Sequence, residues 1–284
     1  MIENTFSQIL DQKRKAVAQL RADPASQAFG KRALEIRKNA EPHRFLRSLE
    51  SDPQRLIIIA EFKRRSPSVG IIRDDLTVSE IVCRYERGGA AAISVLTDEE
   101  YFGGSIADLC AARSVTKLPL LRKDFIIDRI QILEAAAAGA DAVLLIVAAL
   151  DDVSLGQLRT LTEDELGLDA LVEVHSSEEL TRALNAGAKI IGVNNRDLRT
   201  FQISLNTSER LIAEAPPNKI MISESGLRRT ESLLHFHKLG FRGFLIGEAL
   251  MRAPDPEAAV RDLVAAAEGG QWQPTAVPTE GCQP

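Results

Sequence analysis

The feature that most constrains the fold is a repeat of short apolar runs, each followed by turn residues and a longer stretch with helical periodicity. Such runs have the length of buried strands, and the stretches between them have the pattern of helices. Eight runs can be counted: Leu56 to Phe62, Ala91 to Leu96, Leu118 to Arg122, Ala142 to Val147, Ala170 to Val174, Lys189 to Asn194, Lys219 to Ser223 and Gly243 to Gly247. The alternation therefore predicts eight βα units.

Local signals mark where the helices between these runs begin and end. Capping residues open two of them, at Ser176 to Glu179 and at Thr207 to Arg210. Glycines follow several helices just before the next strand, where a left-handed cap is expected. These are Gly88-Gly89, Gly139, Gly187 and Gly240.

Strands that are apolar on both faces favour a parallel sheet covered by helices, and eight units are the number that closes a (β/α)8 TIM barrel. A doubly wound open sheet is the alternative. It would normally carry a glycine-rich dinucleotide loop after its first strand. This chain has Arg64-Arg65-Ser66-Pro67-Ser68 there, so we expect an α/β protein with the barrel fold.

The segments outside the repeat suggest three parts. Residues 1–50 hold a helical pattern from Glu3 to Leu20, interrupted in its apolar register by Lys13, and two shorter helical segments, so we expect an N-terminal helical extension that caps the barrel. Residues 51–268 form the expected catalytic barrel. Residues 269–284 contain two adjacent glycines and little periodicity, and we expect a disordered tail there.

Composition narrows the environment and the partners. The net charge of −5 and the pI near 5.6 argue against a nucleic acid or an anionic membrane as the main partner. No apolar stretch approaches the roughly 18 residues of a membrane span, and the N-terminus lacks a signal-peptide core. Three cysteines form no metal or disulfide spacing. We therefore expect a cytoplasmic protein.

Polar side chains recur where the strands end, which is the active-site face of a barrel. Glu61 and Lys63 follow the first run, and the period of two along a strand puts them on one face with Phe62 on the other. Four further strand ends bring Lys123, Glu173, Asn194 with Arg196, and Glu224 with Ser225. Convergence of five such ends on one mouth predicts an active site.

Two other groups of residues bear on that site. Ser225-Gly226 after the seventh strand and Gly247-Glu248 after the eighth are where many barrels hold a phosphate with backbone N–H groups. His175 follows Glu173 by two residues, and it either faces the site or lies behind it. The remaining histidines have no third ligand at metal spacing, so we expect no metal.

Taken together, these motifs resemble the indole-3-glycerol phosphate synthase family over about residues 3 to 267. The resemblance is carried, in chain order, by Glu61-Phe-Lys-Arg-Arg-Ser-Pro-Ser68, Leu96-Thr-Asp98 with Tyr101-Phe-Gly-Gly104, Leu121-Arg-Lys-Asp-Phe125, Leu144-Leu-Ile-Val147, Glu173-Val-His175, Asn194-Asn-Arg-Asp-Leu198, Ser223-Glu-Ser-Gly226 and Leu245-Ile-Gly-Glu248. Glu248 departs from the family, some of whose members have a small hydroxyl residue there.

The resemblance implies closure of the indole ring of 1-(2-carboxyphenylamino)-1-deoxyribulose 5-phosphate, with loss of carbon dioxide and water and without a cofactor. Lys123 is then the candidate general acid and Glu173 the candidate base of dehydration. Lys63, kept charged by Glu61, would bind the substrate carboxylate and could exchange the acid role with Lys123.

The other expected site residues would bind or orient the substrate. Asn194 and Glu224 would hold substrate hydroxyls or the lysines, and Arg196 would orient nearby carboxylates. Phe102, Phe125, Leu144 and Leu198 resemble the family's apolar slot for the aromatic ring, and the remaining expected binding residues are Ser66, Ser225, Gly226, Gly247 and Glu248.

Two other functions stay open at this point. One is a neighbouring phosphate barrel such as phosphoribosylanthranilate isomerase, which would need a cysteine at the end of the first strand, where this chain has none. The other is a non-catalytic ligand-binding barrel, against which the set of paired lysines and glutamates speaks. The resemblance leaves the oligomeric state and contacts with other tryptophan-pathway enzymes undetermined.

Overall fold

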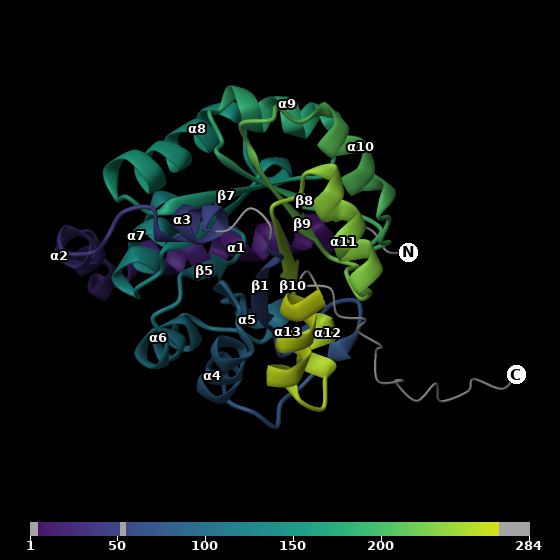
Figure 1. The fold of residues 1–284 in the computed structure, drawn as a ribbon. Coiled ribbons are helices and arrows are strands. Elements are labelled where there is room, and N and C mark those ends of the chain that lie inside the picture. The colour runs from purple at the N-terminus through teal and green to yellow at the C-terminus, as the bar shows by residue number, and fades with distance from the viewer. Residues whose placement is uncertain (1–4, 52–54, 267–284) are drawn as a thin grey trace, which may run out of the picture.

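The computed structural model describes residues 5–51 and 55–266, and its centre is a closed barrel of eight parallel strands (Figure 1). Around the barrel the strands follow the order β1-β10-β9-β8-β7-β6-β5-β4. Their bounds are β1 Ile57–Phe62, β4 Ala92–Leu96, β5 Leu120–Lys123, β6 Ala142–Ile146, β7 Asp169–Val174, β8 Ile190–Asn194, β9 Ile220–Glu224 and β10 Gly243–Ile246. The predicted barrel and each of its eight strands are confirmed, and the open sheet is excluded.

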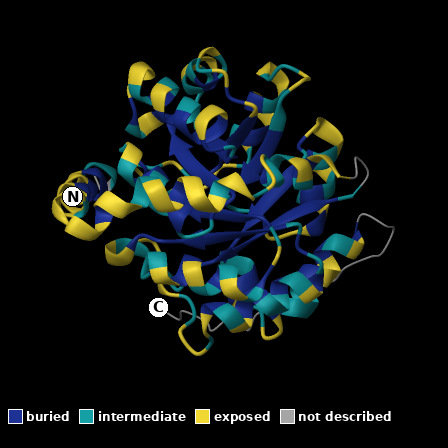
Figure 2. Ribbon diagram, turned by 90° about the vertical axis from the view of Figure 1, so that its left-hand side faces the viewer, coloured by how far each residue is buried: buried dark blue, intermediate teal, exposed yellow. Residues whose placement is uncertain are grey.

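Helices surround the strands and expose their outer faces, while the strands are buried (Figure 2). The longer ones are α4 Val78–Gly88, α6 Ile106–Val115, α7 Arg129–Ala137, α8 Asp152–Thr160, α9 Ser177–Asn185, α10 Asn206–Glu214, α11 Thr230–Leu239 and α13 Pro256–Ala265. The shorter elements are α5 Glu99–Phe102, α12 Glu248–Arg252, the 3-10 helices η1 Pro24–Ala28 and η2 Val147–Ala149, the π-helix η3 Leu161–Glu165, and a hairpin of β2 Arg65–Ser66 and β3 Gly70–Ile71.

Alternation along each strand divides the apolar residues between two cores. On β1, Ile57 and Ile59 point into the barrel, where they join Leu121, Leu171 and other interior residues. Ile58, Ala60 and Phe62 belong to the core between strands and helices. Because the interior is filled by side chains at its lower levels, polar groups find room only at the top, where the strands end.

The local helix signals were largely correct. Gly89 and Gly240 adopt the left-handed conformation as C-caps, and the Ser176 side chain accepts a hydrogen bond from Glu179 N at the start of α9. The predicted cap of α10 is wrong, because that helix begins at Asn206 without a side-chain cap. Ser208 is instead fully buried, and its hydroxyl lies 2.9 Å from that of Ser223.

Three N-terminal helices precede the barrel and reach both of its ends. Helix α1, Thr5–Ala22, places Phe6 and Ile9 at the mouth. Helix α2, Phe29–Lys38, packs outside α7 (Figure 1). Helix α3, Arg44–Glu50, buries Phe45 and Leu49 in the interior core beneath the strands.

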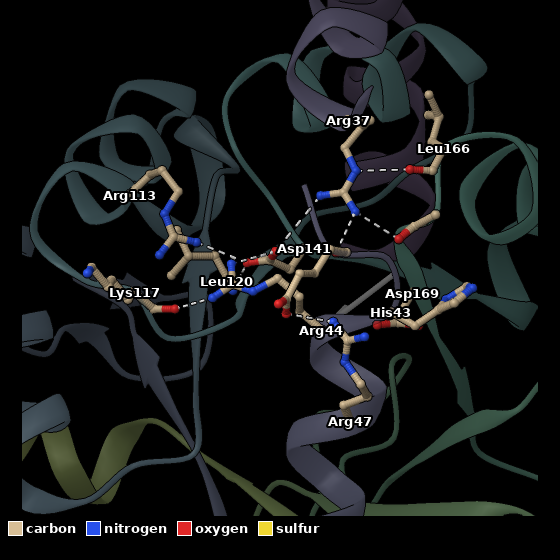
Figure 3. Close-up of polar contacts among 12 residues, drawn as sticks. Arg37, His43, Arg44, Arg47, Arg113, Lys117, Leu120, Asp141, Leu166 and Asp169 are labelled. Atoms are coloured by element: carbon tan, nitrogen blue, oxygen red, sulfur yellow. Dashed lines mark hydrogen bonds and ion pairs between the residues drawn. The ribbon is translucent and has the colours of Figure 1, made fainter. Parts of the chain in front are cut away.

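The contact of α2 and α3 with the base is ionic as well as apolar (Figure 3). Asp141, immediately before β6, is buried and accepts hydrogen bonds from Arg44 Nη1 at 3.0 Å and from Arg113 Nη1 at 2.9 Å. The backbone N–H of Leu120 donates to the same carboxylate at 3.0 Å, and Arg37 Nη1 lies 3.9 Å away. We call these residues the base cluster.

Two predictions concern the ends of the barrel domain. The predicted tail, residues 269–284, lies outside the described residues. The three-part division at residues 50 and 268 stays a prediction. Within the described part of the chain, no helix is both long and apolar enough to cross a membrane.

Candidate active site

One cavity opens at the carboxyl ends of the strands, and every residue predicted for the site lines it. It encloses about 1150 Å³ of empty space, part of which is open to solvent. The structure thus brings together side chains from β1, β5, β7, β8 and β9 with backbone from the loops after β9 and β10.

Glu61 and Lys63 form an ion pair at the end of β1, with 2.7 Å between Lys63 Nζ and Glu61 Oε1. Their common face was predicted from the strand period, and Phe62 lies on the opposite face in the outer core. The Glu61 side chain is 5% exposed and that of Lys63 is 17% exposed, so the lysine is the partner that solvent or a substrate can reach.

Lys123 lines the cavity and lies between two buried carboxylates. Its Nζ is 3.0 Å from Glu173 Oε2 and 2.6 Å from Glu224 Oε2. Burial alone would lower the pKa of this ammonium, but the charges of Glu173, Glu224 and Glu61 outweigh burial and raise the pKa above its ordinary value. Lys123 is therefore charged throughout the neutral pH range.

The two carboxylates beside Lys123 differ in their own pKa values. Burial raises the pKa of Glu224 to about 7, because Lys123 only partly offsets burial and the charges of Glu173 and Glu61. Burial acts on Glu173 too, but Lys123, His175 and a hydrogen bond from Asn194 outweigh it and lower its pKa. The Lys123 ammonium therefore lies between one carboxylate that is ionised, Glu173, and one that takes up a proton near neutral pH, Glu224.

Two interior glycines create the space for this cluster. A Cβ atom at Gly192 on β8 would lie 2.1 Å from Glu224 Oε1, and one at Gly247 would lie 2.2 Å from Glu61 Oε1. Each carboxylate therefore occupies the volume that a side chain on the neighbouring strand would fill.

The corner between β9 and β10 offers backbone groups to an anion. Ser225 and Gly226 have φ values of 66° and 76°, a conformation that is rare for residues other than glycine. Helix α12 begins at Glu248, directly after Gly247. The Glu248 side chain turns to Arg228 and Arg252, each at 3.3 Å, which leaves its backbone at the cavity.

The apolar side of the cavity contains the four residues predicted for it, Phe102, Phe125, Leu144 and Leu198. The Phe125 ring lies 6.3 Å from the ring of Phe102 and also 6.3 Å from that of Phe6. Phe6 and Ile9 belong to α1, and sequence reasoning missed them as lining residues. The apolar pattern of the first helix predicts that Phe6 and Ile9 are buried, but it does not say which part of the protein they pack against.

Two polar residues of the rim connect loops across the mouth. Arg196 Nη1 donates to Ser68 Oγ and to the Phe201 carbonyl, each at 3.2 Å, so the contacts observed for it are with a hydroxyl and a carbonyl rather than with carboxylates. Ser66, on the β2–β3 hairpin, has its hydroxyl 3.4 Å from that of Ser68. The hairpin after β1 is thereby linked to the loop after β8.

Lys13 interrupts the apolar register of α1, and its place in the structure could not be read from that pattern. It is buried, with Nζ 2.8 Å from Asp98 Oδ2 and 2.7 Å from Asp124 Oδ1. Burial raises the pKa of Asp124, but Lys13, Arg122 and Thr97 outweigh burial and lower it to about 2. Helix α1 is therefore ionically attached to the residue next to Lys123.

No group of three or more His, Cys, Asp or Glu side chains in residues 5–51 and 55–266 has the geometry of a metal site. The cavity offers ammonium groups, carboxylates and backbone N–H groups. These can bind an anionic substrate and exchange protons with it.

Comparison with known proteins identifies relatives along nearly the whole chain. A family model described as indole-3-glycerol phosphate synthase matches residues 6–263. The chain is 47% identical over 263 residues to the indole-3-glycerol phosphate synthase of Carboxydothermus hydrogenoformans, covering 88% of this chain and 98% of the relative. It is 43% identical over 264 residues to that of Koribacter versatilis, covering 93% and 100%.

Solved structures with low sequence identity share the fold. Thiamine phosphate pyrophosphorylase from Pyrococcus furiosus matches with a TM-score of 0.55 at 18% identity, over 76% of this chain and 96% of that one. KGPDC from Streptococcus mutans matches with a TM-score of 0.56 at 16% identity, over 75% and 97%. These two likenesses bear on the barrel alone.

Proposed function

The chain belongs to the indole-3-glycerol phosphate synthase family and catalyses that family's reaction in tryptophan biosynthesis, and we propose that Lys123 is its general acid and Glu173 its general base. The reaction converts 1-(2-carboxyphenylamino)-1-deoxyribulose 5-phosphate into indole-3-glycerol phosphate, carbon dioxide and water. The observation that carries the assignment is the Lys123 ammonium held between two buried carboxylates in the cavity.

Ring closure begins when the aromatic carbon that bears the carboxylate attacks the ketone of the sugar. Negative charge develops on the ketone oxygen, and the Lys123 ammonium supplies the proton that converts it to a hydroxyl. The lysine is suited to this step because the carboxylates around it keep it charged before the substrate reacts.

Loss of carbon dioxide follows from the intermediate, in which the former aromatic ring carries both the carboxylate and the new carbon–carbon bond. The carboxylate carbon leaves as carbon dioxide, and the electron pair of the broken bond restores the ring. Lys63 binds the carboxylate before this step, and Glu61, 2.7 Å from its ammonium, holds that side chain in place.

Dehydration completes the indole. Glu173 accepts a proton from the intermediate while the hydroxyl leaves as water with a proton from a lysine of the site. Its lowered pKa keeps Glu173 ionised and able to accept that proton. Asn194, hydrogen-bonded to Glu173, and Glu224, 2.6 Å from Lys123, orient the pair.

The remaining residues bind the two ends of the substrate. The backbone around Ser225-Gly226 and Gly247-Glu248 accepts the phosphate, and Phe102, Phe125, Leu144 and Leu198 surround the aromatic ring. The cavity therefore offers backbone N–H groups to the phosphate of the substrate and apolar side chains to its aromatic ring.

The test is the appearance of indole fluorescence when purified protein meets the carboxyphenylamino-deoxyribulose phosphate. Lys123→Met and Glu173→Gln should each lower kcat by about 100-fold or more, the range for a lost acid or base. Lys238→Met, an exposed lysine on α11, is the matched control and should turn over normally. Undiminished turnover by Lys123→Met in folded protein would refute the assignment of the acid.

A further inference from the structure

Two buried carboxylates share the Lys123 ammonium, but only one of them faces a histidine. His175, directly after β7, has Nε2 3.4 Å from Glu173 Oε1, whereas Lys123 contacts the other oxygen of that carboxylate. Nε2 is buried and finds no hydrogen-bond partner among the described residues, and the same is true of Glu224 Oε1. The environment of the two carboxylates is therefore unequal.

The orientation of His175 is fixed from the other side of its ring. Nδ1 lies 3.1 Å from Glu179 Oε2, and the same oxygen accepts the backbone N–H of His175 at 2.8 Å. Glu179 is in the first turn of α9, which the Ser176 cap holds in place. With both nitrogens next to carboxylates, the ring is set up to carry two protons.

We propose that His175, held by Glu179, is a positioning residue whose imidazolium makes Glu173, and not Glu224, the ionised carboxylate beside Lys123. The proposal rests on the assignment of Glu173 as the base. Lys123 lies closer to Glu224, at 2.6 Å, than to Glu173, at 3.0 Å, so the ammonium by itself does not favour ionisation of Glu173. His175 adds a second cation on the side of Glu173.

The charges around the ring agree with this role. Four carboxylates act on the charge of the ring: Glu173 on β7 and Glu179 on α9 as ion-pair partners, and Asp197 in the loop after β8 and Glu224 on β9 through electrostatics alone. Burial would lower the pKa of His175, but the hydrogen bond with Glu179 and these charges outweigh burial and raise the pKa.

The first experiment compares pH profiles of kcat for the wild type and His175→Asn. The acidic limb reports ionisation of the base, and loss of a cation within about 4 Å should move it to higher pH by about one unit. Glu179→Gln, which keeps the acceptor and removes its charge, should move it in the same direction by less. His235→Asn is the control, since His235 pairs with Glu209 at 3.0 Å on the surface.

The outcomes separate this inference from the assignment on which it rests. An unshifted acidic limb in His175→Asn, together with an inactive Glu173→Gln, would overturn the role of His175 and leave the base in place. An active Glu173→Gln would instead refute the base itself.

A second measurement does not require any active-site variant to fold. The chain has four histidines, so the nitrogen resonances of the wild-type rings can be assigned by elimination with variants of the other three. His175 should be doubly protonated at about pH 7.5, where a histidine with an unperturbed pKa of about 6.5 is mostly neutral. A neutral His175 ring at about pH 7 would overturn the proposal.

Discussion

Both ends of the barrel bury charged side chains, but the ratio of hydrogen-bond donors to carboxylates differs between them. At the base, one carboxylate, Asp141, is surrounded by Arg37, Arg44 and Arg113 and by a backbone N–H. At the mouth, the carboxylates of Glu61, Glu173 and Glu224 outnumber the ammonium groups of Lys63 and Lys123. The base cluster has a surplus of donors and the mouth a surplus of acceptors.

The difference matches what each end does. Donors around Asp141 also reach carbonyls: Arg37 Nε donates to Leu166 O at 2.9 Å and Arg113 Nη2 to Leu118 O at 3.0 Å. No buried side-chain nitrogen or oxygen of Arg37, Arg44, Arg113 or Asp141 lacks a hydrogen-bond partner, and these contacts stabilise the fold. The mouth keeps one buried Glu224 oxygen without a partner among the described residues, and such unmet groups are what a substrate can satisfy.

The largest effect should come from breaking the base cluster with Asp141→Ala. Because three arginines would lose a buried partner, the free energy of unfolding should fall by about 3 to 5 kcal/mol. Urea denaturation measures this. Asp152→Ala removes an exposed partner of Arg182 and should cost only about 0 to 1 kcal/mol. Equal losses for the two variants would contradict the distinction between the base cluster and surface pairs.

The second prediction tests whether α1 stabilises the protein and shapes the site at the mouth, in the way that α3 stabilises the base. Lys13→Met keeps the apolar stem and leaves Asp98 and Asp124 without their shared cation, so the free energy of unfolding should fall by about 2 kcal/mol. KM should also rise, because Phe6 and Ile9 line the cavity from the same helix. Lys15→Met, an exposed position on α1, is the control. An unchanged KM would show that α1 supports the barrel without shaping the site.

In the third prediction, removal of a carboxylate should stabilise the fold, whereas in the first it should destabilise the fold. Glu224→Gln removes one carboxylate from the end that has too many, so the free energy of unfolding should rise by about 1 kcal/mol while kcat falls. Urea denaturation and indole fluorescence on the same preparation measure both. A destabilised Glu224→Gln would mean that the mouth is organised for stability as the base is.

The fourth prediction concerns how that gain depends on pH. The folded-state pKa of Glu224 is raised from 4.5 to about 7, so between these values the folded protein holds a proton that the unfolded chain has released. Stability from this group is present below pH 4.5 and is lost as pH rises through about 7. The advantage of Glu224→Gln over the wild type should therefore grow across that window and level off above it. A constant difference would contradict the raised pKa.

The sequence was sufficient for the features that depend on local pattern. Apolar runs ending in charged residues located β1 and β5 to within about two residues, and the period of two placed Glu61 beside Lys63. Because parallel strands all end at the same edge of a barrel, residues from five strands could be assigned to one mouth before their distances were known.

Features that depend on docking between distant segments were not accessible in this way. Lys13 meets Asp98 and Asp124, both far along the chain, and no period reveals such a pairing. The sequence placed Glu61 beside Lys63 but did not single out a partner for Lys123, which lies between Glu173 and Glu224. Choice of partner depends on side-chain reach and burial, which the pattern of residues does not contain.

The two interior glycines have a consequence for how this site can change through evolution. Since Gly192 gives its space to Glu224 and Gly247 gives its space to Glu61, a side chain at either glycine would displace the facing carboxylate from its lysine. A shorter residue in place of the glutamate would make room, but it would lose its reach to the lysine. Either order of change passes through a weakened intermediate, so substitutions at the four positions are coupled between neighbouring strands.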